Sequence, residues 1–163
     1  MAALKGYSFT QIRLHWVIAV LILFQLIFGE DMGGAWDAFE EGGVPVMTNW
    51  VWAHILVGIA VLALVVWRVA LRLSRGAPEA PHNDSALMIK AAEWGHLALY
   101  AVMVVVPVTG LVAWYGGVEV VAELHGWAKP IVIVLVAGHV AAALYHQFWL
   151  KDGLLLRMKR PLD

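Results

Sequence analysis

The chain of 163 residues contains no cysteine and few charged side chains, and both shortages exclude classes of protein. Without thiols it can form no disulfide bond and no iron–sulfur cluster, and no cofactor can be attached through a cysteine thioether. Charged residues make up 14% of the chain, against about a quarter of an average soluble domain. The sequence also has no glycine-rich phosphate loop, no HExxH motif and no supported serine–histidine–aspartate arrangement. The common soluble hydrolases and nucleotide-binding proteins are therefore excluded.

Apolar residues, in contrast, make up 62% of the chain and are concentrated in four blocks. Each block is close to or above the length that a helix needs to cross about 30 Å of hydrocarbon. We therefore predict an all-α fold, a transmembrane four-helix bundle with up-down-up-down connectivity, in which residues 1–163 form a single domain. The first helix is expected to be retained, because no small-residue cleavage site follows it. The predicted helices are 10–29, 49–72, 88–115 and 125–150, with an acidic loop at 29–49 and a short loop at 116–124.

The few charges are segregated by sign between the two ends of the predicted bundle. By the positive-inside rule, the basic end is expected to be cytoplasmic, which places both termini on the cytoplasmic side of a bacterial inner membrane. Seven acidic residues and one basic residue, Lys129, give the opposite end a formal charge of −6. The basic C-terminal tail is better explained by anionic lipid than by nucleic acid. The basic set is Lys5, Arg13, Arg68, Arg72, Arg75, Lys90, Lys151, Arg157, Lys159 and Arg160, and the acidic set is Glu30, Asp31, Asp37, Glu40, Glu41, Glu119 and Glu123.

Four of the seven histidines lie inside the predicted spans at matching depths. His125 and His139 are fourteen residues apart on the last span, which in a helix is about 21 Å and about four turns, so they share one face. His15 lies near the inner end of the first span and His54 one turn below the outer end of the second. Imidazole is a standard axial ligand of haem iron. Depth therefore predicts two haem b groups, an inner one on His15 and His139 and an outer one on His54 and His125.

Other polar residues in or near the spans have two interpretations each. His146 is predicted to contact a quinone headgroup or a haem propionate, or else to be an ordinary interfacial histidine. His96 enters the third span at the inner side and is an alternative inner ligand to His15 or His139. Arg68 and Arg72 are candidate propionate partners or topological anchors, and Lys129 is a candidate outer propionate partner or a snorkelling lysine. His82 is expected to be solvated. A simple hydrogen bond to a neighbouring helix is the alternative for any single histidine.

Several segments resemble the bacterial cytochrome b561 family of four-helix, di-haem b membrane proteins, over nearly the whole chain. The resemblance implies that His15, His54, His125 and His139 bind haem, and that His146 and His96 lie near a quinone pocket. Family members exchange electrons with ubiquinone, and one type oxidises superoxide at the periplasmic side. The related cytochrome b subunits of formate dehydrogenases and hydrogenases have similar histidine spacing. The matching segments are YS at 7–8, QIRLHW at 11–16, His54 with Gly58, Arg68 with Arg72, GH at 95–96, PVTG at 107–110, GHVAAALYH at 138–146, KDG at 151–153 and LRM at 156–158.

Two functional hypotheses follow from the residues and the resemblance together. The first is an oxidoreductase that passes electrons from a periplasmic donor, superoxide by resemblance, to membrane ubiquinone. The second is a haem b anchor and relay subunit that serves a separate periplasmic dehydrogenase or cytochrome. The acidic outer end does not favour steering of an anion such as superoxide, and it suits a basic periplasmic redox protein better.

Overall fold

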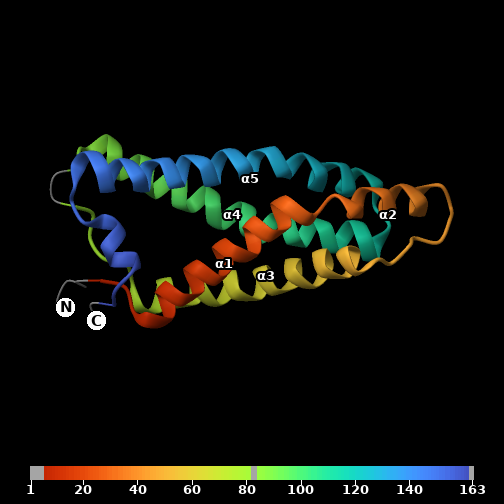
Figure 1. Cartoon of the computed structure of the whole chain (residues 1–163), viewed down its shortest axis with the longest axis horizontal. Helices are drawn as coiled ribbons and strands as arrows, with labels where there is room; N and C mark the ends of the chain where they lie inside the picture. The colour runs from red at the N-terminus through yellow and green to blue at the C-terminus, as the bar shows by residue number, and fades with distance from the viewer. Residues whose placement is uncertain (1–5, 82–83, 162–163) are drawn as a thin grey trace.

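The computed structural model describes residues 6–81 and 84–161, and all regular structure within them is helical. Four helices are long and apolar enough to cross a membrane, so the predicted four-helix transmembrane bundle is confirmed. They alternate in direction along the molecule, with one short helix beyond one end (Figure 1). Lys5 and His82 lie outside the described residues. The helices are α1 (Phe9–Phe28), α2 (Asp31–Glu40), α3 (Asn49–Arg75), α4 (Ala86–Gly116) and α5 (Glu119–Tyr145), followed by a π-helical segment (His146–Leu150) and a 3-10 segment (Leu154–Met158).

Hydroxyl side chains begin three of the long helices. Ser8 accepts a hydrogen bond from the Gln11 backbone N–H, and the Gln11 side chain accepts one from the Ser8 N–H, which forms a capping box. Thr48 and Ser85 cap α3 and α4 in the same way through one hydrogen bond each. These caps satisfy backbone donors that would otherwise lack partners where each helix meets the membrane surface.

Two predicted loops are partly helical, and the prediction was wrong there. The region 29–49 contains α2, whose Ala35 is buried against Val51 and Ile55 of α3. The expected loop at 116–124 is only a tight turn, because Gly117 adopts a left-handed conformation (φ 63°) and α5 begins at Glu119. A helix that extends beyond the bilayer into water accommodates acidic side chains, and a carboxylate in its first turn interacts favourably with the helix dipole.

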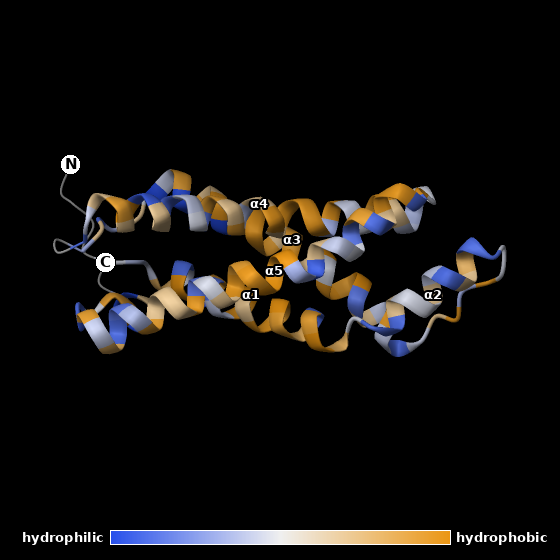
Figure 2. Ribbon diagram, turned by 90° about the horizontal axis from the view of Figure 1, so that it is seen from above, coloured by the Kyte–Doolittle hydropathy of each residue, from blue (hydrophilic) through white to orange (hydrophobic). Residues whose placement is uncertain are grey.

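The long helices pack in the order α1–α3–α4–α5. The main buried cluster, Leu14 and Ile18 of α1 with Val61 and Val65 of α3, lies nearer the end that holds the chain termini. Most apolar side chains on the helices are exposed, which is the arrangement expected where lipid is the solvent. Hydropathy is highest along the middle of the helices, and polar residues gather towards their ends and in α2 (Figure 2).

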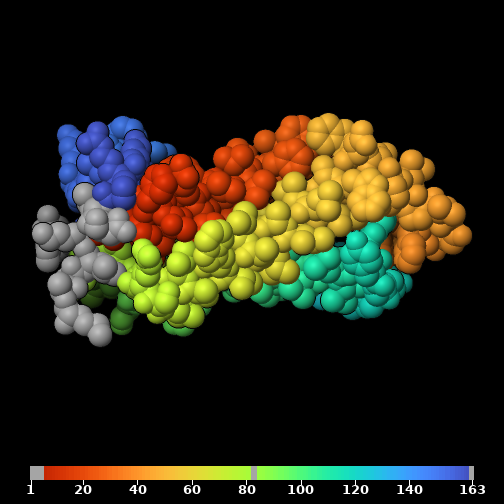
Figure 3. All heavy atoms as spheres, turned by 90° about the horizontal axis from the view of Figure 1, so that it is seen from below, coloured from red at the N-terminus to blue at the C-terminus, as the bar shows by residue number. Residues whose placement is uncertain are grey.

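The two ends of the bundle differ in construction. At one end, here called the termini end, the C-terminal segment lies beside the start of α1, and at the other, the α2 end, α2 covers the helix tips (Figure 3). The indole N–H of Trp16 donates to the Met158 carbonyl at 2.8 Å, and Arg157 donates to the Glu79 carbonyl at 2.6 Å. The C-terminal segment is thereby tied to α1 and to the connection between α3 and α4.

Candidate functional site

At the α2 end, the structure brings His54 of α3 and His125 of α5 together. Their ring centroids are 6.0 Å apart and the rings are nearly perpendicular. At the termini end, His15 of α1 and His139 of α5 also have centroids 6.0 Å apart. His96 of α4 joins this second group, with its ring 5.4 Å from that of His139. The two pairs predicted from depth are thus neighbours in space, and the predicted rival, His96, is a neighbour too.

The 6.0 Å separations can be compared with the requirement for a shared metal ion. A metal–imidazole nitrogen bond is about 2.0–2.1 Å, and that nitrogen lies about 1.1 Å from the ring centroid, so two axial imidazoles have centroids about 6.3 Å apart. His54 and His125 are close to this value, and so are His15 and His139. The His96–His139 separation of 5.4 Å is too short by almost 1 Å on the same scale.

The imidazole of His125 is held in one tautomer by the helix that faces it. Its Nδ1 lies 2.9 Å from the Val106 carbonyl, which only accepts, so Nδ1 carries the proton and Nε2 keeps its lone pair. The Thr109 hydroxyl lies 3.3 Å from the same nitrogen. The ring lies against Gly110, where an added Cβ would be 2.9 Å from His125 Cε1. A backbone carbonyl is a usual hydrogen-bond partner of a metal-binding histidine.

His54 is held differently, through its backbone. The Gln25 side chain of α1 donates from Nε2 to the His54 carbonyl at 2.8 Å. Among the described residues, both His54 Nδ1 and Gln25 Oε1 are buried without a hydrogen-bond partner. An added Cβ on Gly29 would lie 3.2 Å from His54 Nδ1. Buried unpaired polar atoms are costly, so their presence in a histidine pair indicates a site that is completed by something other than these side chains.

The histidines of the termini end have two arginines in their surroundings, and one of the histidines makes a hydrogen bond to the backbone. His96 Nδ1 donates to the Ala92 carbonyl at 2.7 Å, which leaves its Nε2 free to bind a metal. Arg68 acts electrostatically on His15 and His139, and Arg72 acts on His96. These cations can neutralise carboxylates of a bound cofactor. Arg68 also donates to the Gln11 carbonyl at 2.6 Å and so has a structural role. Lys129, one turn after His125, is exposed.

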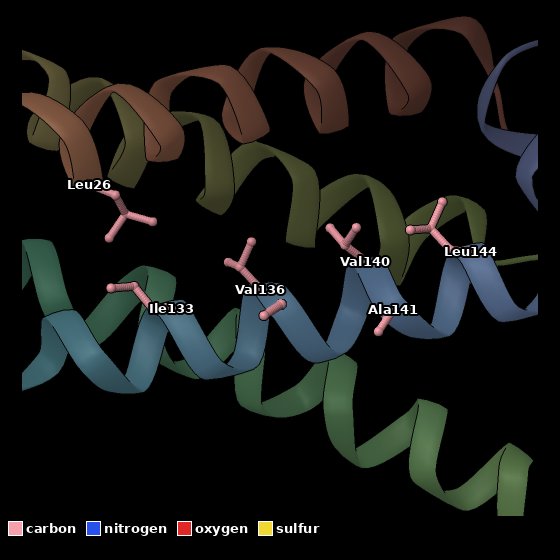
Figure 4. A pocket seen from close by; sticks show the side chains of 7 residues that line it. Leu26, Ile133, Val136, Val140, Ala141 and Leu144 are labelled. Atoms are coloured by element: carbon pink, nitrogen blue, oxygen red, sulfur yellow. The ribbon is translucent and has the colours of Figure 1, made fainter.

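An apolar groove runs along α5 from Ile133 to Leu144, past the level of His139. It has a volume of about 470 Å³ and opens to the outside. Leu26 of α1 reaches towards it from the opposite side (Figure 4). Helix α1 is packed mainly on α3, so α1 and α5 approach each other with space between them. The six lining residues on α5 are Ile133, Val136, Ala137, Val140, Ala141 and Leu144.

Beyond α5 the chain forms a histidine–carboxylate contact that sequence reasoning missed. His146 is buried, and its Nδ1 lies 2.5 Å from Asp152 Oδ2, while Asp152 Oδ1 accepts the Leu154 N–H. Burial favours the neutral acid, but the hydrogen bonds from His146 and Leu154 and the charge of Arg157 outweigh it and lower the pKa of Asp152. The spacing of six residues does not suit a regular helix, so the pair could not be read as neighbours without the π-helical segment that joins them.

Comparison with known proteins agrees with this arrangement. Residues 6–161 match the family model described as prokaryotic cytochrome b561. The chain is 40% identical over 156 residues to the protein named "Cytochrome b562" of Cereibacter sphaeroides, covering 96% of each chain. It is 28% identical to "Cytochrome b561 homolog 1" of Escherichia coli, covering 95% of this chain and 97% of the relative. It is 26% identical to "Probable superoxide oxidase CybB" of Yersinia pestis, covering 94% and 96%. The chain therefore belongs to the prokaryotic cytochrome b561 family, as the sequence resemblance predicted, and is a multi-pass haem b membrane protein of electron transfer.

Proposed function

We propose that this protein binds two haem b groups and passes electrons from a donor at the α2 end to ubiquinone at the termini end. The observation that carries the proposal is the pair of imidazole couples, each with a centroid separation of 6.0 Å. Two such couples share α5, on which His125 and His139 are about 21 Å apart along the axis. The positive-inside rule supports an inner-membrane orientation with the termini end in the cytoplasm.

His54 and His125 are the proposed ligands of one haem, and His15 and His139 those of the other. Haem b between two imidazoles takes up and releases one electron and has no open coordination position, which suits electron transfer. The separation of 6.0 Å favours His15 over His96 as the partner of His139. His96 then lies beside the inner haem and near the quinone, as a neighbour of the ligands.

The surrounding residues orient the ligands and balance charge. The Val106 carbonyl keeps the proton of His125 on Nδ1, which would leave Nε2 to bind the iron of a haem. Arg68 and Arg72 lie in the electrostatic environment of the inner histidines, where they would pair with propionates. Lys129 is the corresponding candidate at the α2 end. His146, buried at the termini end, is the proposed contact of the ubiquinone headgroup.

Superoxide is the proposed small-molecule donor, because the Yersinia pestis relative carries the name of a superoxide oxidase. The charge at the α2 end supports a second candidate, a relay function for a basic periplasmic redox protein. Seven exposed carboxylates surround this end, and they repel a small anion while attracting a cationic protein surface. They are Glu30, Asp31, Asp37, Glu40, Glu41, Glu119 and Glu123.

Haem content is the first test of the proposal. The purified protein should give two haem b per chain by the pyridine haemochrome assay. His54→Ala and His15→Ala should each lose one haem and keep the other, while His146→Ala, as a matched control outside both couples, should keep both. A content of one haem or none in the unaltered protein would overturn the proposal.

The salt dependence of haem reduction separates the two donors. Reduction by superoxide should speed up with added salt, because salt screens the repulsion between an anion and the carboxylates. Reduction by a basic c-type cytochrome in its reduced form should slow down with salt for the opposite reason. Reduction by superoxide alone supports the oxidase function, and reduction by the cytochrome alone supports the relay function.

A further inference from the structure

The chain that follows α5 is folded back so that a carboxylate meets the buried His146. The helix widens into a π-helical segment, His146–Leu150, and then reverses through two residues with left-handed backbone, Lys151 (φ 54°) and Gly153 (φ 77°). Asp152, between them, is thereby turned onto His146. A π-helical segment and a non-glycine residue at positive φ both cost free energy relative to a regular helix. Their joint effect here is to place one carboxylate against one imidazole.

A second carboxylate approaches the pair from a distant part of the chain. Asp84, in the connection before α4, offers an oxygen within 4.8 Å of the donor atoms of His146 and Asp152. Its Oδ1 is buried and has no hydrogen-bond partner among the described residues. Three other titratable groups among the described residues lie near the pair: Arg157 acts on Asp152, Lys151 precedes Asp152 in the chain, and the ring of Tyr145 lies 6.3 Å from that of His146.

A hollow of about 360 Å³ lies at the termini end beside the segment that carries the pair, although its lining includes neither His146 nor Asp152. Gln147, which follows His146, lines this hollow, and so do both neighbours of Asp152 in the chain, Lys151 and Gly153. Phe148 and Leu156 add apolar surface to it. The hollow is therefore part apolar and part polar, as expected for a site that takes an aromatic ring carrying carbonyl oxygens.

We propose that His146, Asp152 and Asp84 form the proton-delivery relay for quinone reduction at the termini end. The inference rests on the proposed function, which supplies the electrons. Reduction of a quinone to a quinol consumes two electrons and two protons, and both carbonyl oxygens become hydroxyls. His146 donates one proton to one quinone oxygen and is reprotonated from water on the termini side by way of Asp84, while water supplies the second proton to the other oxygen. Asp152 is a positioning residue that holds the Nδ1–H of His146 and stabilises positive charge on the ring.

The electrostatics of Asp152 suit this role. Because its pKa is held below the ordinary value, Asp152 is a carboxylate at neutral pH and accepts the His146 proton as an anion. The unpaired oxygen of Asp84 supplies the next acceptor towards the aqueous phase. The alternative occupant of two carboxylates and an imidazole is a divalent cation. A bound cation would occupy the lone pairs that the relay needs, so the two possibilities exclude each other.

The test uses the purified haem-loaded protein, reduced in advance and mixed with a short-chain ubiquinone in a stopped-flow instrument. Asp152→Asn and Asp84→Asn should slow haem reoxidation, by as much as about 100-fold for Asp152→Asn, because a neutral amide in place of Asp152 cannot stabilise positive charge on His146 and an amide in place of Asp84 cannot carry a proton. Added formate, a small weak acid, should restore part of the rate. Glu93→Gln, which removes an exposed carboxylate of α4 near the same end, should leave the rate unchanged. The haem α-band of each variant shows that the fold and both haems are retained.

The outcomes separate the relay from the function on which it rests. If quinone does not reoxidise the unaltered protein, the proposed function falls and takes the relay with it. If the unaltered protein is reoxidised but both aspartate variants match it at every pH from about 6 to about 9, the relay alone is wrong. Slowing without rescue by formate would assign the aspartates a merely structural role and would also overturn it. A stoichiometric divalent metal other than iron, found by elemental analysis, would assign the cluster to a cation instead.

Discussion

Gly110→Ala should selectively weaken binding of the haem proposed for the α2 end. The added Cβ would lie 2.9 Å from Cε1, 3.2 Å from Nδ1 and 3.4 Å from Nε2 of His125. Carbon atoms in contact are normally about 3.5–4.0 Å apart, so the ring must retreat by about 0.6–1 Å. The bond from His125 Nδ1 to Val106, now 2.9 Å, would then exceed the usual limit for a hydrogen bond.

The size of the expected effect follows from the loss of the hydrogen bond between His125 and the Val106 carbonyl. A buried carbonyl left without its donor costs about 1–3 kcal/mol, and loss of a partner that orients a metal ligand typically weakens metal binding by about 10–100-fold. The same substitution in the interior of a helix should otherwise stabilise the helix by about 1 kcal/mol, because alanine is the better helix former. The steric argument therefore predicts weaker haem binding, whereas helix propensity alone predicts a slightly more stable protein. The assay distinguishes the two.

The assay is the transfer of haem to an excess of an apo-haem acceptor protein, followed in the visible spectrum. Gly110→Ala should release one haem about 10–100-fold faster than the unaltered protein and hold the other normally. Gly95→Ala is the matched control in the same helix, since its Cβ would meet nothing within 4 Å. Equal release from Gly110→Ala and the unaltered protein would refute the proposed packing of His125 on α4.

Three further changes test other parts of the site. His125→Ala should reduce the haem content from two per chain to one, and retention of both would refute its assignment as a ligand. Gln25→Leu removes the donor to the His54 carbonyl and should weaken binding of the same haem by about tenfold, measured by the transfer assay; an unchanged rate would show that Gln25 does not position His54. The contact between Asp152 and His146 should persist at all pH values above the ordinary carboxyl pKa of 3.8 and be lost as the pH falls through the lower folded-state pKa. The protection of residues 146–158 against hydrogen exchange, relative to the intrinsic rate at each pH, should therefore fall only in acid, whereas Asp152→Asn should show lower protection already at neutral pH.

Much of the fold follows from the sequence because a bilayer constrains a chain so strongly. The thickness of the hydrocarbon sets the length of a span, so four apolar blocks predict four helices. The depth of each histidine in the membrane can also be predicted from the sequence, because the fixed rise per residue of a helix converts sequence position into height. For this reason His54 and His125 could be predicted as neighbours, and so could His15 and His139.

Rotation about the helix axes and the course of the chain beyond the bilayer are decided only in three dimensions. Depth alone could not tell that His96 faces the same group as His139, because depth does not specify which way a helix turns its side chains. The contact of His125 with Gly110 depends on how closely α4 and α5 approach, and that distance is a property of two packed surfaces. The pairing of His146 with Asp152 needs a π-helical segment and a left-handed residue, and no periodic pattern predicts either. The sequence by itself determined the number and polarity of the spans and the heights of their histidines, because the bilayer sets the composition of a span and the helix sets the rise per residue. The tertiary structure decided which side chains meet at each height, because contacts depend on helix rotation and packing.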